Sequence, residues 1–346
     1  MKKLMMLCIA FAAVALMGTA MVAAADDAPL LKGTAYVAGH GGHLAVINLS
    51  TWDLDRIPIT HAGSETEGVI AGLHLDAAHK KPGGGTHGAA LIGRDLFVGL
   101  LDGRIKKYNL DTQKLTDLGQ VGEKFCGAIP GPGGKNIYYE DMADGDVYQF
   151  NIKKEKKADV IPVGKAVCGI AWTKDGKTAF VSDMVQGKVF ILNWKTKKKI
   201  GAIPVGTFIH QIRMNPAHTE LWVSAPNEFV VTAKGPVPSS VAGKGKSQIV
   251  IIDVNKRKVK DRIDLTDDQL FPHDFAFTPD GKYVLLSCRT YSDDSILAVM
   301  NAKTHKIVKE VSICKRCHEQ AGVKIKIDNG SPLLCGIAVD WGKNPE

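Results

Sequence analysis

Short apolar runs separated by turns rich in Gly, Asp and Pro occupy most of the chain from residue 35 onward. Five segments each hold an apolar run, a turn such as Lys174-Asp175-Gly176-Lys177, and a second apolar run, a pattern that predicts β-hairpins. Two further apolar runs follow in each unit, so each unit is expected to form four antiparallel strands. The segments are HGAALIGRDLFVG from His87, CGAIPGPGGKNIYYE from Cys126, CGIAWTKDGKTAFVS from Cys168, HQIRMNPAHTELWVS from His210 and HDFAFTPDGKYVLLS from His273.

These units recur at a regular interval. Cys126, Cys168 and His210 open three successive units at a spacing of 42 residues, which is the length of a four-stranded propeller blade. Tandem blades of this kind imply a closed ring. The sequence therefore predicts an all-β fold, specifically a β-propeller.

The two ends of the chain complete the ring in this prediction. Three strands without an innermost partner come from residues 35–38, 43–49 and 55–60. A lone innermost strand comes from CGIAVDW, which begins at Cys335. Pairing them closes the ring and removes exposed sheet edges. This count gives six blades. The length also permits seven if residues 61–86 hold a degenerate blade, although their Gly and His content predicts a loop.

The first residues have the pattern of a secretory signal peptide: Lys2 and Lys3, an apolar run over residues 4–16, and small residues up to position 25. Its removal takes away Cys8 and leaves one domain, residues 26–346. The formal net charge of +8 falls to +6 without the two lysines, which is too mild to indicate nucleic-acid binding. No later stretch is apolar over the roughly 18 residues of a membrane helix. We expect a periplasmic or otherwise exported protein without a membrane span.

The repeats VCGIAWTKDGKTAFVSD and PHDFAFTPDGKYVLLSC resemble those of YVTN-type periplasmic β-propellers. That family includes the haem d1 domain of cytochrome cd1 nitrite reductase and the β-subunits of amine dehydrogenases, and the resemblance covers nearly the whole mature chain. It implies the propeller architecture, and it favours a redox role because several members are redox partners or hold cofactors. Propellers host unrelated chemistries, so function has to be argued from the site residues.

Topology places the first residues of the six innermost strands in a ring at one mouth of the central channel. All six are His or Cys: His87, Cys126, Cys168, His210, His273 and Cys335. Three insertions, residues 61–86, 225–247 and 314–334, are expected to rise over the same mouth. Nine of the 11 histidines fall on this face, and only His218 and His305 fall on the other.

Imidazole and thiolate ligate soft or borderline metals and haem iron, so the ring predicts a second metal or haem at the mouth. Small or polar residues that merely line a narrow channel are the structural alternative, because a buried Cys usually acts as a small hydrophobe. Disulfides are the competing use of the cysteines in an oxidising compartment. Cys126 and Cys168 lie on neighbouring blades, and Cys288 is able to pair with Cys335 only if their Cα atoms come within about 7 Å.

The most specific motif is Cys314-Lys315-Arg316-Cys317-His318. C-x-x-C-H is the attachment site of a c-type haem, in which Cys314 and Cys317 form thioethers and His318 ligates the iron. A reducible disulfide or half of a zinc site is the alternative. We expect one covalent haem c, held in an insertion rather than in a cytochrome fold. His61, His74 and His79 are the candidates for the opposite axial ligand, together with the ring histidines.

Lysines and arginines are concentrated in the turns at the other end of the blades, and such turns are either simply solvated or able to dock an acidic redox partner. These residues are Lys153, Lys154, Lys156, Lys157, Lys195, Lys197, Lys198, Lys199, Lys256, Arg257, Lys258 and Lys260.

Other catalytic signatures, such as G-x-S-x-G, H-E-x-x-H and a P-loop, are absent from the sequence. The favoured function is electron transfer as a subunit or partner of a periplasmic redox enzyme. The alternatives are an oxidoreductase whose site is the His/Cys ring, acting on a small nitrogen compound or anion, and a haemless scaffold subunit of a redox complex.

Overall fold

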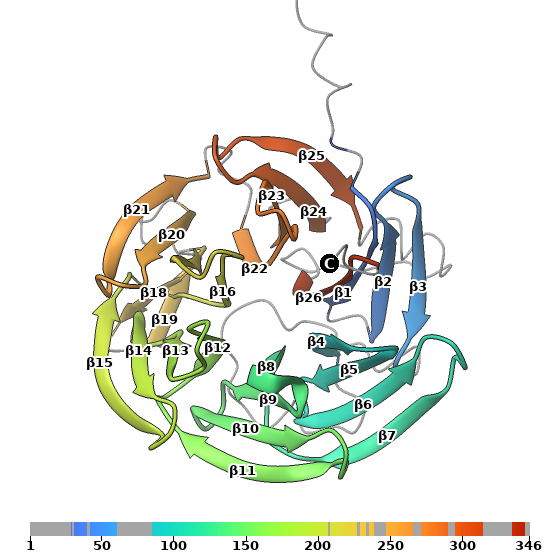
Figure 1. Ribbon diagram of the computed structural model, residues 1–346, viewed down its shortest axis with the longest axis horizontal. Coiled ribbons are helices and arrows are strands. Elements are labelled where there is room, and N and C mark those ends of the chain that lie inside the picture. Colours follow the sequence, from blue (N-terminus) through green and yellow to red (C-terminus); the bar gives the residue numbers. More distant parts are fainter. Residues whose placement is uncertain are drawn as a thin grey trace, which may run out of the picture.

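A computed structural model describes residues 29, 31–39, 42–60, 85–206, 208–226, 229–232, 235–238, 247–265, 271–289, 295–313 and 334–342. The signal peptide, the C-x-x-C-H motif and the axial-ligand candidates His61, His74 and His79 lie outside these residues. In the described part of the chain, the strands form six four-stranded antiparallel sheets around a central axis, and the fold is a six-bladed β-propeller (Figure 1).

We number the blades from the one that joins the two ends of the chain. Blade 1 holds β26 (Leu334–Asp340), β1 (Thr34–Gly39), β2 (His43–Asn48) and β3 (Leu54–Pro58). Blade 2 holds β4 (Thr86–Ile92), β5 (Asp95–Leu100), β6 (Arg104–Asn109) and β7 (Leu115–Gln120). Blade 3 holds β8 (Phe125–Pro130), β9 (Asn136–Asp141), β10 (Asp146–Asn151) and β11 (Lys156–Pro162), with a short 3-10 turn, η2 (Pro132–Gly134), after β8.

Blade 4 holds β12 (Val167–Trp172), β13 (Thr178–Asp183), β14 (Lys188–Asn193) and β15 (Lys198–Pro204). Blade 5 holds β16 (Ile212–Met214), β17 (Glu220–Ala225), β20 (Gln248–Asp253) and β21 (Lys258–Asp264), and a separate hairpin of β18 (Phe229–Thr232) and β19 (Gly235–Pro238) is inserted between its second and third strands. Blade 6 holds β22 (Phe271–Phe277), β23 (Tyr283–Arg289), β24 (Ser295–Asn301) and β25 (Ile307–Ser312).

The innermost strands contact one another in an unbroken circle. β26 contacts β4, and the contacts continue through β8, β12, β16 and β22 back to β26. Since β26 and β4 are direct neighbours, no further blade fits between blades 1 and 2. The prediction of six blades is confirmed, and the seventh blade that residues 61–86 would have supplied is excluded.

Strands from both ends of the chain close the ring, as the sequence predicted. β1 pairs with β26 in antiparallel register, with Val37 opposite Ile337 and Thr34 opposite Asp340, and β2 covers the other edge of β1. The long sequence separation makes this pairing costly to form, but it covers the inner edge of β1, so β1 is paired along both of its edges.

Apolar side chains between adjacent blades form the core. The second strand of each blade is buried on both faces, so it reads as a continuous apolar run such as Phe180-Val181 in β13. The outermost strands are mostly exposed instead, and β15 exposes all its residues except Ile203. Large aromatic side chains help to fill the gaps between blades, for example Trp222, which packs with Phe275 between blades 5 and 6.

The turn between the third and fourth strands has the same construction in all six blades. An Asn or Asp at the end of the third strand accepts hydrogen bonds from backbone N–H groups of the turn, as Asn301 does from Lys303 and Thr304. The fourth residue beyond it has a left-handed conformation although it is not glycine. These residues are Trp52, Gln113, Glu155, Lys197, Arg257 and His305.

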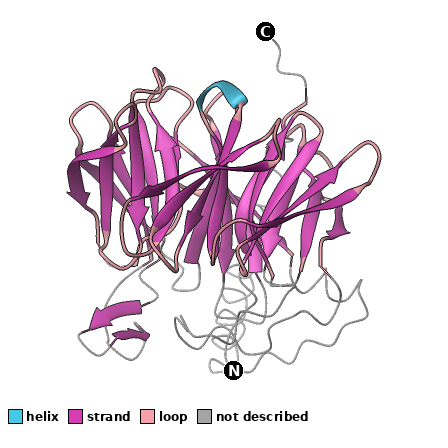
Figure 2. Cartoon of the chain, turned by 90° about the horizontal axis from the view of Figure 1, so that it is seen from below, coloured by secondary structure: helices cyan, strands magenta, loops and turns pink. Residues whose placement is uncertain are grey.

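The two ends of the propeller differ. The first strand of each blade starts at one end, and Figure 2 shows the β18–β19 hairpin projecting from that end, whereas η2 lies at the other. His218 and His305 are in turns at the η2 end, while His43, His87, His210 and His273 belong to the opposite end, as predicted.

Candidate functional site

Five of the six ring residues lie in irregularities of the sheet. The pairing of the first and second strands skips His87, Cys126, Cys168 and His273, and the β1–β26 register shifts around Cys335. A bulge adds one residue to a strand and re-aims its side chain, which is a common device beside functional sites. His210 precedes β16 by two residues, and its N–H donates to the carbonyl of Ser224.

Three imidazole rings gather at the mouth. The ring centroids of His210 and His273 are 4.5 Å apart, and those of His87 and His273 are 5.1 Å apart. Phe208 covers His210 at 5.2 Å. His87 donates from Nδ1 to the carbonyl oxygen of Cys126 at 2.6 Å, so its lone pair is on Nε2.

Burial keeps two of these histidines neutral. It lowers the pKa of His87 to about 4, because the imidazolium form loses its hydration, and the hydrogen bond to Cys126 offsets only part of the loss. Burial, and then the proximity of His87, lowers the pKa of His210 to about 3. Neutral imidazoles are the form that ligates metals.

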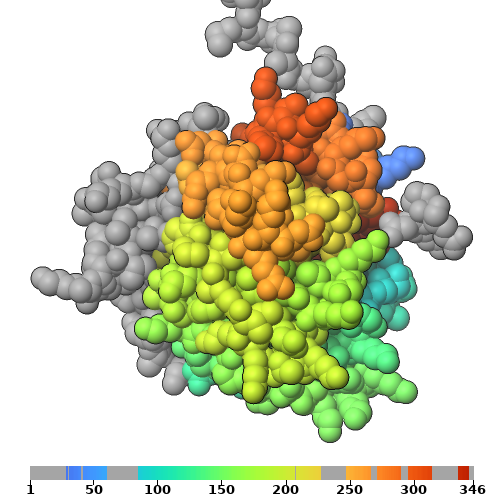
Figure 3. All heavy atoms as spheres, turned by 60° about the vertical axis from the view of Figure 1, so that its left-hand side comes forward, coloured from blue at the N-terminus to red at the C-terminus, as the bar shows by residue number. Residues whose placement is uncertain are grey.

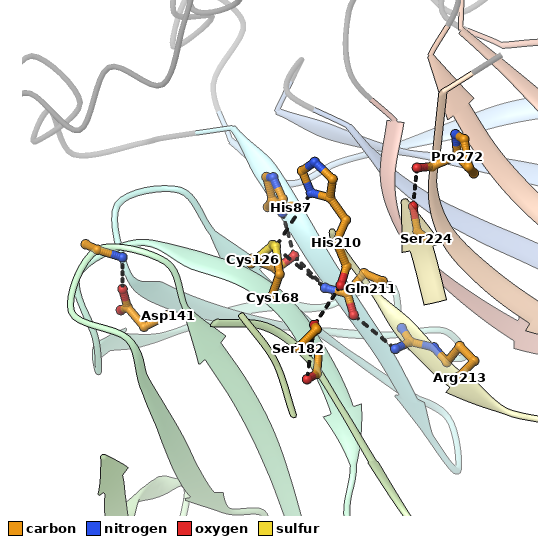
Figure 4. Close-up of a disulfide and its surroundings, with 12 residues drawn as sticks. His87, Cys126, Asp141, Cys168, Ser182, His210, Gln211, Arg213, Ser224 and Pro272 are labelled. Atoms are coloured by element: carbon orange, nitrogen blue, oxygen red, sulfur yellow. Dashed lines mark hydrogen bonds between the residues drawn. A yellow bond between two sulfur atoms is a disulfide. The ribbon is translucent and has the colours of Figure 1, made fainter. Parts of the chain in front are cut away.

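Cys126 and Cys168 are joined by a disulfide between the innermost strands of blades 3 and 4, with their Cα atoms 5.1 Å apart (Figure 4). Of the two uses that the sequence left open for this pair, the structure therefore has the disulfide. The Sγ atom of Cys168 is 3.6 Å from Nδ1 of His210. Cys288 is a buried thiol on β23, and burial raises its pKa.

Two sets of ring residues place their ligand atoms close together. His87, Cys126 and His273 form one set, and Cys126, Cys168 and His210 form the other; within each set the ligand atoms lie within 4.8 Å of one another. The sequence prediction that the ring residues converge is thus realised for these five. Whether they hold a metal stays a prediction.

Glycine closes the channel directly below the ring. The residue after the ring residue is Gly in four blades, and the strands approach so closely that a Cβ on Gly88 would lie 2.4 Å from the carbonyl carbon of Gly127. A Cβ on Gly169 would lie 2.7 Å from the nitrogen of Ile212. In the other two blades this position is Gln211 or Asp274, and both side chains are fully buried.

Hydrogen-bonded polar groups link the innermost strands next to the ring. Gln211 donates from Nε2 to the Cys126 carbonyl at 3.2 Å, and its Oε1 accepts from Arg213 at 3.0 Å. Arg213 also donates to Asp274 at 2.6 Å, and the same carboxylate oxygen accepts from the N–H of Ile337. The buried charge of Asp274 is therefore compensated.

Glu140 enters this channel without such compensation. It is fully buried, and neither carboxylate oxygen has a hydrogen-bond partner among the described residues. Burial raises its pKa to about 8, and the charge of Arg213 and the backbone N–H groups of Glu140 and Ile170 lower that pKa only in part. The group is therefore largely protonated at neutral pH.

Sequence reasoning missed Gln211, Arg213, Asp274 and Glu140. A usable signal was present in the repeats. The residue that follows the ring residue is Gly in four blades, and Gln211 and Asp274 replace it in the other two. Glu140 likewise stands where Ser182, Ser224 and Ser287 stand in three other blades. Departures from a repeat at channel-facing positions mark residues that the fold alone does not require.

No protein-family model matches the chain, and no curated protein matches its sequence. Among solved structures, a hydrazine synthase from Kuenenia stuttgartiensis is similar over 69% of this chain and 68% of its own, with 18% identity and a TM-score of 0.52. The β-propeller domain of Cps50 (Swd1) from Myceliophteria thermophila is similar over 82% of this chain and 88% of its own, with 14% identity and a TM-score of 0.51. At these identities both similarities show the propeller fold alone.

The class that the fold and the site define is therefore a six-bladed propeller with a buried His/Cys ring at one mouth. None of the residues that the structure describes forms a helix with the length and apolar character that a membrane crossing needs.

Proposed function

We propose that this chain is an exported propeller that carries one covalent c-type haem and transfers electrons as a subunit or partner of a periplasmic redox enzyme. The observation that carries the proposal is the sequence Cys314-Lys315-Arg316-Cys317-His318. Cys314 and Cys317 would hold the haem through thioethers, and His318 would ligate its iron. The haem supplies reversible one-electron chemistry when it is bound.

The described residues on either side of the motif fit this role. Ile313 follows β25, Leu334 opens β26, and both are buried in the same apolar cluster between blades 6 and 1. Both ends of the haem-bearing insertion are therefore held together, and Leu334 directly precedes the ring residue Cys335. A short segment anchored at both ends of its span is suited to holding a cofactor near the mouth.

The ring contributes neutral donors at the mouth. His87 is buried, His210 is partly buried, and both are uncharged at neutral pH, so they line the mouth without adding positive charge. The wall of buried apolar strands around them limits the access of water. Burial and low polarity around a haem are among the factors that set its reduction potential.

A positively charged partner surface is available at the other end. The exposed lysines of β11, β15 and β21 belong to three consecutive blades, whose outer wall is shown in Figure 3. They start at the end of the propeller opposite the ring, because the third-to-fourth strand turns lie there. An acidic partner protein would be attracted to these lysines over a long range and oriented as it approaches.

The test is covalent haem in protein matured with a native haem c assembly system. The mature chain should carry a mass excess of one haem that survives denaturation and is lost in Cys314→Ala/Cys317→Ala. A matched Cys288→Ala variant, which removes a buried thiol outside the motif, should keep the excess. Wild-type protein without the excess would refute the cytochrome assignment and leave two functions, an oxidoreductase with its site on the His/Cys ring and a haemless scaffold.

A further inference from the structure

Cys126 is common to both sets of close ligand atoms at the channel mouth. One set adds Cys168 and His210 to Cys126, and the other adds His87 and His273. Cys126 and Cys168 are fully buried and lie on adjacent innermost strands, which the surrounding blades hold in place. The positions of these two sulfur atoms therefore depend on the propeller core and not on a loop.

One distance between the donors matches a particular coordination geometry, whereas the two bonded sulfur atoms have to separate on reduction before both are able to act as ligands. A tetrahedral Zn²⁺ with the usual Zn–S and Zn–N bond lengths has its sulfur and nitrogen ligands about 3.5 Å apart. The observed distance from Cys168 Sγ to His210 Nδ1 is 3.6 Å. A disulfide sulfur is a poor ligand, however, because metals bind the thiolate.

We propose that Cys126, Cys168 and His210 form a site with two mutually exclusive states, a disulfide when oxidised and a bis-thiolate, single-imidazole metal site when reduced. The ligand is a soft or borderline cation of the Zn²⁺ class. Three protein ligands are enough for a site that keeps one position for water or a substrate atom. The site is independent of the proposed haem, since it uses none of the residues of the C-x-x-C-H motif.

The conversion balances with a dithiol as reductant. The dithiol supplies two electrons and two protons: the bond between Cys126 and Cys168 breaks, both become thiols, and the dithiol closes to a cyclic disulfide. Zn²⁺ then displaces the two thiol protons as the thiolates bind. The proton on His210 moves to Nε2, so that the Nδ1 lone pair faces the metal.

Two neighbouring interactions hold the imidazole and thiolate donors in place. Ser182 donates to the carbonyl of His210 at 2.7 Å, which fixes the backbone of this ligand against blade 4. Gln211 Nε2 lies 3.9 Å from Cys126 Sγ and donates to the carbonyl of the same residue. An amide N–H close to the sulfur favours the thiolate over the thiol.

The experiment uses the full mature chain with Cys314→Ser/Cys317→Ser, so that no haem and no other C-x-x-C thiols are present. The protein is either reduced anaerobically with dithiothreitol, which is then removed by desalting in anaerobic buffer, or left untreated, and Zn²⁺ binding is measured by equilibrium dialysis. A parallel Co²⁺ titration reports thiolate ligation through sulfur-to-metal charge transfer. We expect one Zn²⁺ per chain in the reduced protein and none in the oxidised protein, with charge transfer from two thiolates.

Two variants test the ligand set. His210→Gln keeps both cysteines and should weaken Zn²⁺ binding at least tenfold, whereas His305→Gln, at the far end of the propeller, should leave it unchanged. Zn²⁺ binding that is equal with and without the reductant would overturn the proposal. So would reduced protein, with both thiols confirmed by titration, that binds no Zn²⁺. The wild-type protein with its haem is treated in the same way, as a control for the folding of the Cys314→Ser/Cys317→Ser variant. Loss of haem from this wild-type protein would bear on the proposed function and not on the metal site.

Discussion

The hydroxyl of Ser287 donates a hydrogen bond to the carbonyl oxygen of Cys335, 2.5 Å away, across the boundary between blade 6 and the closing blade 1. Ser182 makes the equivalent bond from blade 4 to His210 of blade 5. Both serines are fully buried at the same position of the second strand. This bond ties the innermost strand of one blade to the sheet of the previous one, and it fixes the backbone of a ring residue.

Removal of this hydroxyl should destabilise the propeller. Ser287→Ala leaves the buried carbonyl of Cys335 without its side-chain donor, and we expect a loss of about 1–3 kcal/mol in the free energy of unfolding. Urea denaturation followed by tryptophan fluorescence measures it. Thr304→Ala, at an exposed turn of the same blade, is the control and should change stability by less than about 0.5 kcal/mol. Equal effects of the two substitutions would contradict the assigned role of Ser287.

Glu140 should make stability fall as the pH rises. Its pKa is about 8 in the folded chain against an ordinary value of 4.5, so between these values the folded state holds a proton that the unfolded state has released. Its contribution is fully present below the lower value and is lost as the pH passes the upper one, by on the order of a few kcal/mol. Glu140→Gln carries no such proton, and thermal unfolding should show it more stable than wild type at pH 9, with the difference shrinking toward pH 5.

The control for this pH dependence is Glu123→Gln, because Glu123 is exposed. Its melting temperatures should run parallel to those of the wild type across the same pH range. A Glu140→Gln profile that also runs parallel would mean that the buried carboxyl is compensated in solution.

The repeated turn between the third and fourth strands gives two substitutions of opposite sign. Asn301→Ala removes the acceptor for the N–H groups of Lys303 and Thr304 and should cost about 1 kcal/mol. Arg257 has a positive φ of 52° and is exposed, so Arg257→Gly should relieve backbone strain and stabilise the chain by up to about 1 kcal/mol. Differential scanning calorimetry of both variants checks the signs, and destabilisation by Arg257→Gly would show that the side chain matters more than the backbone.

The second axial position of the proposed haem decides between electron transfer and ligand activation. His61, His74 and His79 are the candidates from the sequence. If one of them ligates the iron opposite His318, the oxidised protein should give a low-spin electron paramagnetic resonance signal that is lost in the corresponding Ala variant. A dominant high-spin signal, unaffected by His74→Ala or His79→Ala, would instead indicate an open coordination site and defeat the electron-carrier assignment.

The fold was largely predictable because each blade repeats the same signals. The Gly of the turn at Gly176 and the matching one at Gly281 both have positive φ, and the lone strand from Cys335 has one obvious place in a closed ring. The ring of His and Cys also followed from topology, since it needs only the direction of the innermost strands.

The chemistry within the ring was not predictable to the same extent. Whether Cys126 pairs with Cys168 or ligates a metal depends on distances of a few ångströms, which strand order does not supply. The bulges that turn His87 and Cys126 toward the axis have no residue signature in a single sequence. Glu140 reads as an ordinary strand residue until the blades on either side bury it.

The pairing of β1 with β26 also sets an order of events during biosynthesis. The first three strands of the propeller are made about 300 residues before their innermost partner, so they remain an unfinished sheet until the last strand has been translated. The Cys314 to His318 motif is made just before that strand. Ring closure therefore needs the last strand, and a chain that stops short of β26 would leave the inner edge of β1 unpaired.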